Sequence, residues 1–219
     1  MGVPDSTNGD IFHNWAKLPI SREQFAQEST ENMRRLFPNC TPLPGAKEIV
    51  ENLSRACSAG SGDRIELALA STTTSHSYAL KTSGPETKQL LSLFRSERRV
   101  LGDDPRLQKG RSKPAPDIYL LALQALNAAV GPDGKAIQPN ECLAFEDSLV
   151  GVEAARRAGM RVVWVPHPDM VVEYQTRQKE VLAVEADDWH PGRIDDGWTE
   201  TIQSLEHFDY KKYGIVVTP

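Results

Sequence analysis

The feature that most constrains the fold lies between Cys142 and Val165, where two short apolar runs flank a helix rich in small residues. The first run ends at Phe145, and Ser148 is a good N-cap for the helix that follows. Small residues recur at helical spacing along one face of that helix, which lets it lie close against a sheet: Gly151, Ala154, Ala155 and Ala158. Gly159 suits the left-handed position that ends a helix. The segment therefore predicts a strand, a helix and a second, parallel strand.

The rest of the chain extends this alternation of helices and short apolar strands. Predicted helices lie near 22–37, where Ser21 and Gln24 form a capping box, from about 45, twice within 75–94, and from 117 onward. Predicted strands cover 65–70, 100–101 and 181–184, and residues 1–14 resemble a loose arm. Alternating elements of this kind predict an α/β fold with a Rossmann-like parallel sheet.

Composition excludes several classes of function. A net charge of −5 gives no support for nucleic-acid binding, and no apolar run reaches the length of a signal peptide or a membrane span. The three cysteines, Cys40, Cys57 and Cys142, lack metal-binding or redox spacing, which suits a reducing compartment. We therefore expect a soluble, cytoplasmic protein with no membrane partner.

Polar groups follow the predicted strands. Ser71 follows the strand at 65–70, Glu146 and Asp147 follow the run at 142–145, and Lys113 opens a helix. Carboxyl ends of parallel strands meet at one edge, so these groups should converge there. A hydroxyl, an ammonium and two acids that can bind Mg²⁺ are what phosphoryl chemistry requires. In the alternative interpretation, Asp147 only supports the helix cap and Glu146 is solvated.

At these residues the chain resembles the haloacid dehalogenase superfamily of phosphatases. The resemblance rests on ASTTT at 70–74, GRSKPAPDIY at 110–119 and FEDSLVGVEAARRAGM at 145–160, which look like the second, third and fourth motifs of that superfamily. The segments LPISREQFAQES, LPGA and VLGDDP resemble its pseudouridine-5′-phosphatase-like branch. The resemblance implies that Ser71 and Lys113 are catalytic, that Ser71, Thr72 and Lys113 bind phosphate, and that Glu146 and Asp147 hold Mg²⁺.

The same resemblance exposes a missing part. The superfamily uses an aspartate nucleophile in a D-x-D-G-type motif after its first, central strand, and this sequence contains no such motif. The nucleophile, the central strand and the first half of a small helical cap are therefore expected to be missing, which one N-terminal truncation would explain. The expected domains are an arm with a partial cap at 1–42 and an α/β core with a C-terminal tail at 43–219.

Three functional hypotheses follow. The first is a Mg²⁺-dependent phosphomonoesterase that acts on a small sugar or nucleoside monophosphate through an aspartyl-phosphate intermediate, inactive in the form of this sequence. The second is a non-catalytic pseudophosphatase that binds phosphate, metal or another protein through the same pocket. The third is a generic doubly wound domain in which the acid pair of Glu146 and Asp147 arose by chance.

Overall fold

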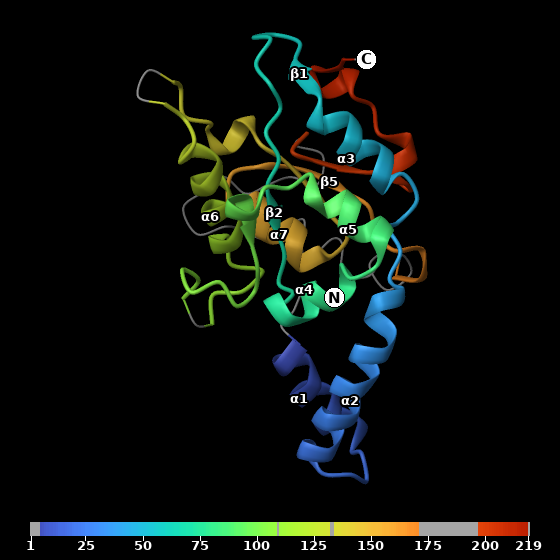
Figure 1. The fold of residues 1–219 in the computed structure, drawn as a ribbon. Coiled ribbons are helices and arrows are strands. Elements are labelled where there is room, and N and C mark those ends of the chain that lie inside the picture. The colour runs from blue at the N-terminus through green and yellow to red at the C-terminus, as the bar shows by residue number, and fades with distance from the viewer. Residues whose placement is uncertain (1–4, 109, 132–133, 171–196, 219) are drawn as a thin grey trace.

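A computed structural model describes residues 5–108, 110–131, 134–170 and 197–218 (Figure 1). Its α-helices are α1 (Asp5–Ala16), α2 (Arg22–Leu36), α3 (Ala46–Ser54), α4 (Ser75–Lys81), α5 (Pro85–Ser92), α6 (Asp117–Asn127) and α7 (Leu149–Arg157). Its strands are β1 (Ala56–Ser58), β2 (Leu69–Ala70), β3 (Arg99–Val100), β4 (Leu143–Glu146), β5 (Arg161–Trp164), β6 (Thr199–Thr201) and β7 (Ile215–Val217). Among the described residues, no helix combines the length and the hydrophobicity that crossing a bilayer requires.

The strands form three separate groups. Strands β4, β5 and β6 make a parallel sheet in that order, β2 pairs with β3 in parallel, and β1 pairs with β7 in antiparallel. Within the described part of the chain, no backbone ladder joins β2 to β4. The parallel α/β class predicted from the sequence is confirmed, and the sheet is divided between β2 and β4.

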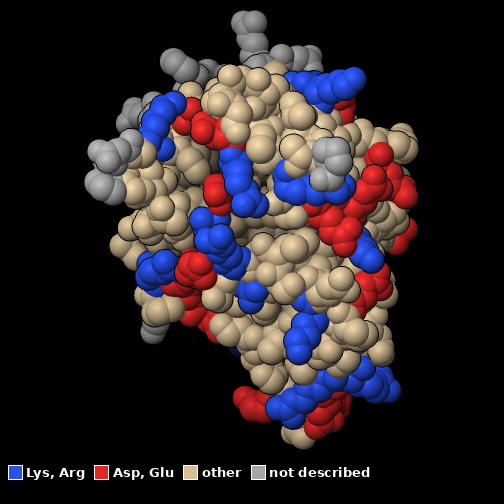
Figure 2. All heavy atoms as spheres, turned by 45° about the horizontal axis from the view of Figure 1, so that its top comes forward, with Lys and Arg blue, Asp and Glu red and all other residues tan. Residues whose placement is uncertain are grey.

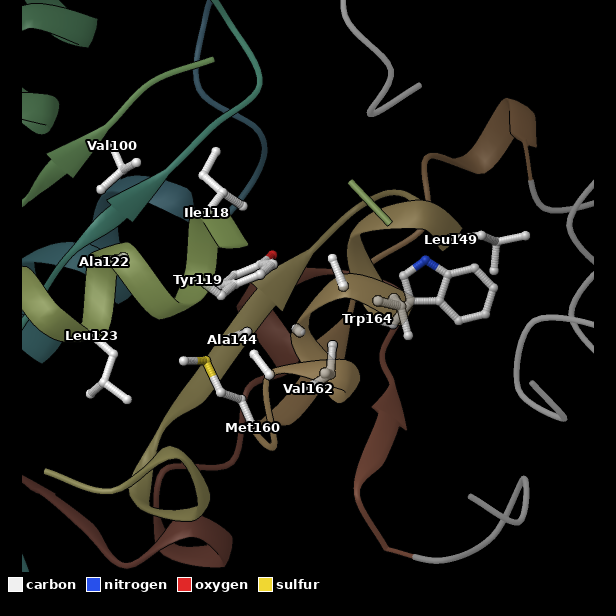
Figure 3. Packing of buried hydrophobic residues seen from close by; sticks show 14 residues of the cluster. Val100, Ile118, Tyr119, Ala122, Leu123, Ala144, Leu149, Met160, Val162 and Trp164 are labelled. Carbon is white, nitrogen blue, oxygen red and sulfur yellow. The ribbon is translucent and has the colours of Figure 1, made fainter. Parts of the chain in front are cut away.

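The two parallel groups nevertheless lie in one layer, because side chains of both alternate between the same two apolar clusters. The larger cluster, packed by α6 and α7, includes Ala144, Val162 and Trp164 (Figure 3), and Ala68 and Ala70 pack against it from β2 and its approach. The smaller cluster, packed by α3 and the C-terminal segment, takes Ile65, Leu67, Leu143, Phe145 and Val163. The arrangement is three-layered, with a sheet between two helical or loop layers.

The strand–helix–strand unit at 142–165 forms as its sequence predicts. Ser148 caps α7 by accepting a hydrogen bond from the Gly151 amide at 3.2 Å. The small residues of α7 are buried against the sheet, and Gly159 ends the helix with a φ of 77°. Local capping and small side chains therefore explain why this unit can be predicted from its own sequence.

The prediction of a loose arm over residues 1–14 is wrong for residues 5–14, because α1 begins at Asp5 and packs against α2 as a helical hairpin (Figure 1). The rings of Phe12 and Phe25 stack with centroids 5.9 Å apart, and the His13 Nε2 atom lies 2.9 Å from the Ile20 carbonyl oxygen. These contacts lie between helices, so a scan for local periodicity does not detect them.

Strand predictions were less accurate at their boundaries. The strand expected over Ile65–Ala70 is confined to β2, because among the described strands only β3 pairs with it, and over only two residues. The strand expected at 181–184 lies outside the described residues. Strand β6, which the sequence does not suggest, pairs with the edge of β5 that β4 leaves free. Strands β1 and β7 were also unexpected.

Candidate active site

The candidate site lies at the carboxyl ends of β2 and β4. Ser71 follows β2, Glu146 is the last residue of β4, and Asp147 follows it. Lys113 comes from the loop before α6, and its ammonium lies between the two strand ends, 3.5 Å from the Ala70 carbonyl oxygen and ion-paired with the Glu146 carboxylate. The structure therefore brings Lys113, Glu146 and the end of β2 together, as the order of the strands predicts.

Lys113 and Glu146 form a buried pair. Their side chains are 6% and 5% exposed, and the hydroxyl of Tyr119 on α6 donates to the same Glu146 oxygen that Lys113 contacts. The Lys113 ammonium lies 3.4 Å from that hydroxyl and 5.0 Å from the centre of the Tyr119 ring. Burial and the charge of Glu146 raise the pKa of Tyr119, so this phenol stays protonated and serves as a hydrogen-bond donor.

Helix α7 also holds Glu146 in place. The Ser148 hydroxyl donates to Glu146 Oε2 at 3.2 Å. The carboxylate lies against Gly151, where a β-carbon would come within 2.0 Å of Oε2. The close approach of the Glu146 carboxylate therefore requires a glycine at position 151, and so does the packing of α7 on the sheet.

Asp147 lies beside this pair. Its backbone carbonyl accepts a hydrogen bond from the buried Trp164 indole at 3.3 Å, which fixes the chain just after β4. Burial, followed by the adjacent Glu146 charge, raises the pKa of the Asp147 carboxyl. Two neighbouring, poorly solvated carboxylates are a donor set that fits a hard divalent cation such as Mg²⁺, which often takes only one or two protein carboxylates. Among the described residues no third acid, histidine or cysteine joins them.

The loop after β2 is fixed by its neighbours. The Ser71 amide donates to the Val100 carbonyl at 3.0 Å, and the Ser71 hydroxyl oxygen accepts from the Thr73 amide at 3.2 Å, which leaves its own hydrogen free to donate. Thr72 passes close to Gly102, where a β-carbon would lie 2.1 Å from the Thr72 carbonyl oxygen. Ser71 and Thr72 thus lie next to the Ala70 carbonyl that Lys113 reaches.

Sequence reasoning missed Tyr119. The residue ends the GRSKPAPDIY segment, but that segment suggests a role for Lys113 alone. Tyr119 is nevertheless buried, with its ring directed from α6 toward β4 (Figure 3). A buried tyrosine needs a partner for its hydroxyl, but only the structure shows that Tyr119 is buried.

The sequence model of the haloacid dehalogenase-like hydrolase family matches residues 20–159, which is more than half of the chain. The chain belongs to this family. The match spans β2, Lys113 and β4, so the family assignment and the geometry concern the same part of the molecule. The predicted superfamily is thereby confirmed.

Similar proteins cover most of the chain. An uncharacterized protein of Schizosaccharomyces pombe is 32% identical over 97% of this chain and 77% of its own length. A probable pseudouridine-5′-phosphatase of Saccharomyces cerevisiae is 33% identical over 98% of this chain and 79% of its own length. A (DL)-glycerol-3-phosphatase of Arabidopsis thaliana is 32% identical over 74% of this chain and 60% of its own length.

Solved structures agree with the fold. A family IA, variant 3 hydrolase of Entamoeba histolytica superposes with a TM-score of 0.61 at 18% identity, over 94% of this chain and 77% of that one. CbbY of Rhodobacter sphaeroides, crystallised with xylulose-(1,5)bisphosphate, superposes with a TM-score of 0.53 at 23% identity, over 87% of this chain and 67% of that one. At these identities the likeness supports the fold alone.

Proposed function

We propose that the candidate active site of this protein is that of a phosphomonoesterase, which hydrolyses a small phosphorylated metabolite. The observation that carries the proposal is the buried Lys113 ammonium, held between the ends of β2 and β4 beside Glu146. A cation at this position offsets the charge of phosphoryl oxygens. The phosphatase names of two relatives, which concern pseudouridine phosphate and glycerol 3-phosphate, support a sugar or nucleoside monophosphate as the substrate class.

Each residue of the site has a proposed role. Ser71 and Thr72 hydrogen-bond the phosphoryl oxygens, and the Ser71 hydroxyl is oriented for this by the Thr73 amide. Lys113 neutralises charge on the phosphoryl group. Glu146 and Asp147 hold Mg²⁺, which when bound supplies further charge neutralisation at the phosphoryl group. Tyr119 and Ser148 position the Glu146 carboxylate without contacting the substrate.

The nucleophile is the part that this sequence does not supply. Phosphoryl transfer in this family's mode needs an aspartate beside the lysine, and the sequence contains no D-x-D pattern. The division of the sheet supports the same conclusion. Strands β2 and β4 lie in one layer, yet no described strand pairs with the edges that face each other. We infer that the nucleophile belongs on a strand between them and that the polypeptide of this sequence does not turn over substrate alone.

The absence of an aspartate nucleophile also favours a second candidate, a pseudophosphatase that binds phosphate and metal without hydrolysis. Both candidates require the same pocket. They differ only in whether the protein in its natural source carries the additional strand.

Two measurements test the proposal. The first is the intact mass of the protein from its natural source, compared with 24.3 kDa for this sequence. The second is Mg²⁺-dependent phosphate release from pseudouridine 5′-phosphate and glycerol 3-phosphate, by the natural protein and by the 219-residue chain. We expect a heavier natural protein that hydrolyses at least one ester, and a short chain that does not.

Matched variants assign the activity to the site. Lys113→Gln should abolish turnover by the natural protein, whereas Lys135→Gln, at an exposed lysine paired with Glu141, should leave it unchanged. A natural protein of 24.3 kDa without turnover would favour the pseudophosphatase. Turnover by the short chain, or a Lys113→Gln variant with full activity, would contradict the proposed site.

A further inference from the structure

A small cavity lies at the edge of the sheet opposite the candidate active site. Its volume is about 80 Å³, and three arginines, Arg64, Arg95 and Arg98, line it together with Glu66, Ser54 and three apolar side chains. Glu66 precedes β2, and Arg98 directly precedes β3. Because β2 and β3 are parallel, the cavity lies at their amino ends, whereas Ser71 and Lys113 lie at the carboxyl ends. In Figure 1, the chain descends through β2 to α4, so this is the upper edge.

Arg98 is an unusual residue in this cavity, because it is charged and only 6% exposed. One of its terminal nitrogens forms an ion pair with the Glu66 carboxylate. Its Nε atom is also buried, and no described residue accepts a hydrogen bond from it. A buried donor without an acceptor is costly in a folded protein, so the guanidinium has hydrogen-bonding capacity that the described residues do not use.

The other two arginines add to the positive charge. Arg64 is exposed and donates to the Ser54 carbonyl at 3.0 Å through one terminal nitrogen. Arg95 is exposed, and its guanidinium makes no hydrogen bond or ion pair with any described residue, although its backbone carbonyl accepts from the Arg98 amide at 3.0 Å. Glu66 is the only acid among the described residues that line the cavity, so these residues carry a surplus of two positive charges in a chain whose net charge is −5.

Neighbouring charged groups do not remove this surplus. Arg99 is occupied elsewhere, since it donates to the Leu91 and Phe94 carbonyls at the end of α5. Glu97 is exposed and does not line the cavity. A backbone hydrogen bond, then the Ser96 hydroxyl and the charges of the nearby Arg95 and Arg98, lower its pKa, so it offsets part of the surplus without removing it. Figure 2, which turns the upper edge forward, shows basic and acidic side chains side by side on that face and no continuous basic surface. The positive charge at the cavity is therefore local.

We propose that this cavity binds a phosphoryl group, either as inorganic phosphate or as the head group of a phosphomonoester. Guanidinium groups donate paired hydrogen bonds that match phosphate oxygens, and three of them converge here. The volume is well below the roughly 300–1,000 Å³ of pockets that enclose a whole small molecule, so only the anionic group enters. This site is separate from the proposed active site and does not depend on the function proposed for it.

The test uses inorganic phosphate and the full 219-residue chain carrying Lys113→Gln, which removes phosphate binding at the candidate active site. A ligand that binds the native state raises Tm, so Tm is followed against phosphate concentration at constant ionic strength. Arg95→Gln and Arg64→Gln should each weaken the apparent affinity about tenfold. Glu66→Gln, which frees Arg98 from its internal partner, should strengthen it.

The matched control is Arg106→Gln, at an arginine that pairs with Asp104 away from the cavity, and it should leave the phosphate affinity unchanged. Glycerol 3-phosphate provides the second arm. An increase in Tm with both ligands indicates a phosphomonoester head group, and an increase with phosphate alone indicates the free ion. The proposal is overturned if phosphate does not raise Tm, if chloride of equal ionic strength raises it equally, or if Arg95→Gln and Arg64→Gln leave the affinity unchanged.

Discussion

Replacing Lys113 with methionine tests whether the buried ion pair at the candidate site is as enclosed as the structure indicates. Methionine keeps much of the apolar stem and removes the charge, so Glu146, with a side chain 5% exposed, loses its cation. Removing one partner of a buried pair costs about 3–5 kcal/mol. The hydroxyls of Tyr119 and Ser148 still donate to Glu146, so we expect the lower end, about 3 kcal/mol in the free energy of unfolding.

The double variant separates charge burial from packing. When both Lys113 and Glu146 become methionine, neither member of the pair is left as a buried charge without its partner, and such replacements are often close to neutral. Tyr119 and Ser148 then lose an acceptor, which costs about 1 kcal/mol each. We therefore expect a total cost of about 2 kcal/mol, smaller than that of Lys113→Met alone.

Urea unfolding followed by far-ultraviolet circular dichroism measures these differences by linear extrapolation, provided that the m value is unchanged. Lys135→Met, at a lysine whose side chain is 79% exposed, should change the free energy of unfolding by less than about 0.5 kcal/mol. If Lys113→Met costs no more than this control, or if the double variant is the least stable of the three, the description of Glu146 and Lys113 as a buried pair is wrong.

Three further predictions concern other residues. Gly151→Ala should lower the free energy of unfolding by about 1–3 kcal/mol, because displacement of the Glu146 carboxylate by the new β-carbon outweighs a helix-propensity gain of at most about 1 kcal/mol. The same displacement should weaken Mg²⁺ binding measured by calorimetry. Gly102→Ala should cost about 3 kcal/mol in urea unfolding, because its β-carbon meets the rigid backbone of Thr72. Glu200→Gln should remove about 0.5–1 kcal/mol of stability at neutral pH and reduce the loss of stability on acidification.

The sign of the last effect follows from the hydrogen bonds that Lys212 and then Tyr213 donate to Glu200, which lower the pKa of that carboxyl. A lowered pKa contributes stability above the unfolded-state pKa, and this contribution is lost as the pH falls through the folded-state pKa. If the stability of Glu200→Gln fell with decreasing pH as steeply as that of the unsubstituted protein, this reasoning would be contradicted.

Gly60→Ala is the control for the glycine variants, because a β-carbon there meets nothing closer than the Ser58 hydroxyl at 3.9 Å.

The parts of the fold that the sequence predicted correctly are those whose determinants are local. Ser148, the small face of α7 and Gly159 lie within one short segment, and each acts on its own neighbours in the chain. Strand β6 has the opposite character, since Thr199–Thr201 is polar and becomes a strand only by pairing with β5. The β1–β7 pair similarly joins Cys57 to Val216, a separation that no window of local periodicity covers.

The candidate site divides in the same way. Lys113 and Glu146 could be placed together from the order of the strands, because parallel strands bring their carboxyl ends to one edge. Tyr119 could not, since its role depends on the exact rotation of α6. Arg98 lies in the charged segment from Arg95 to Arg99, whose sequence is typical of a solvated surface loop. The structure places Arg98 directly before β3, where it is buried.

The division of the sheet gives Lys113 a structural role as well as a chemical one. Strands β2 and β4 lie in one layer, but no backbone ladder joins them within the described residues, and Lys113 contacts the ends of both. Lys113 therefore adds a side-chain contact between the two strand ends, beside the shared apolar clusters, where a continuous sheet would use hydrogen bonds between backbones. Removing the Lys113 charge should consequently loosen the strand ends and weaken phosphate binding together, whereas a variant of Ser71, which lies in the loop beyond β2, should weaken phosphate binding with little effect on stability.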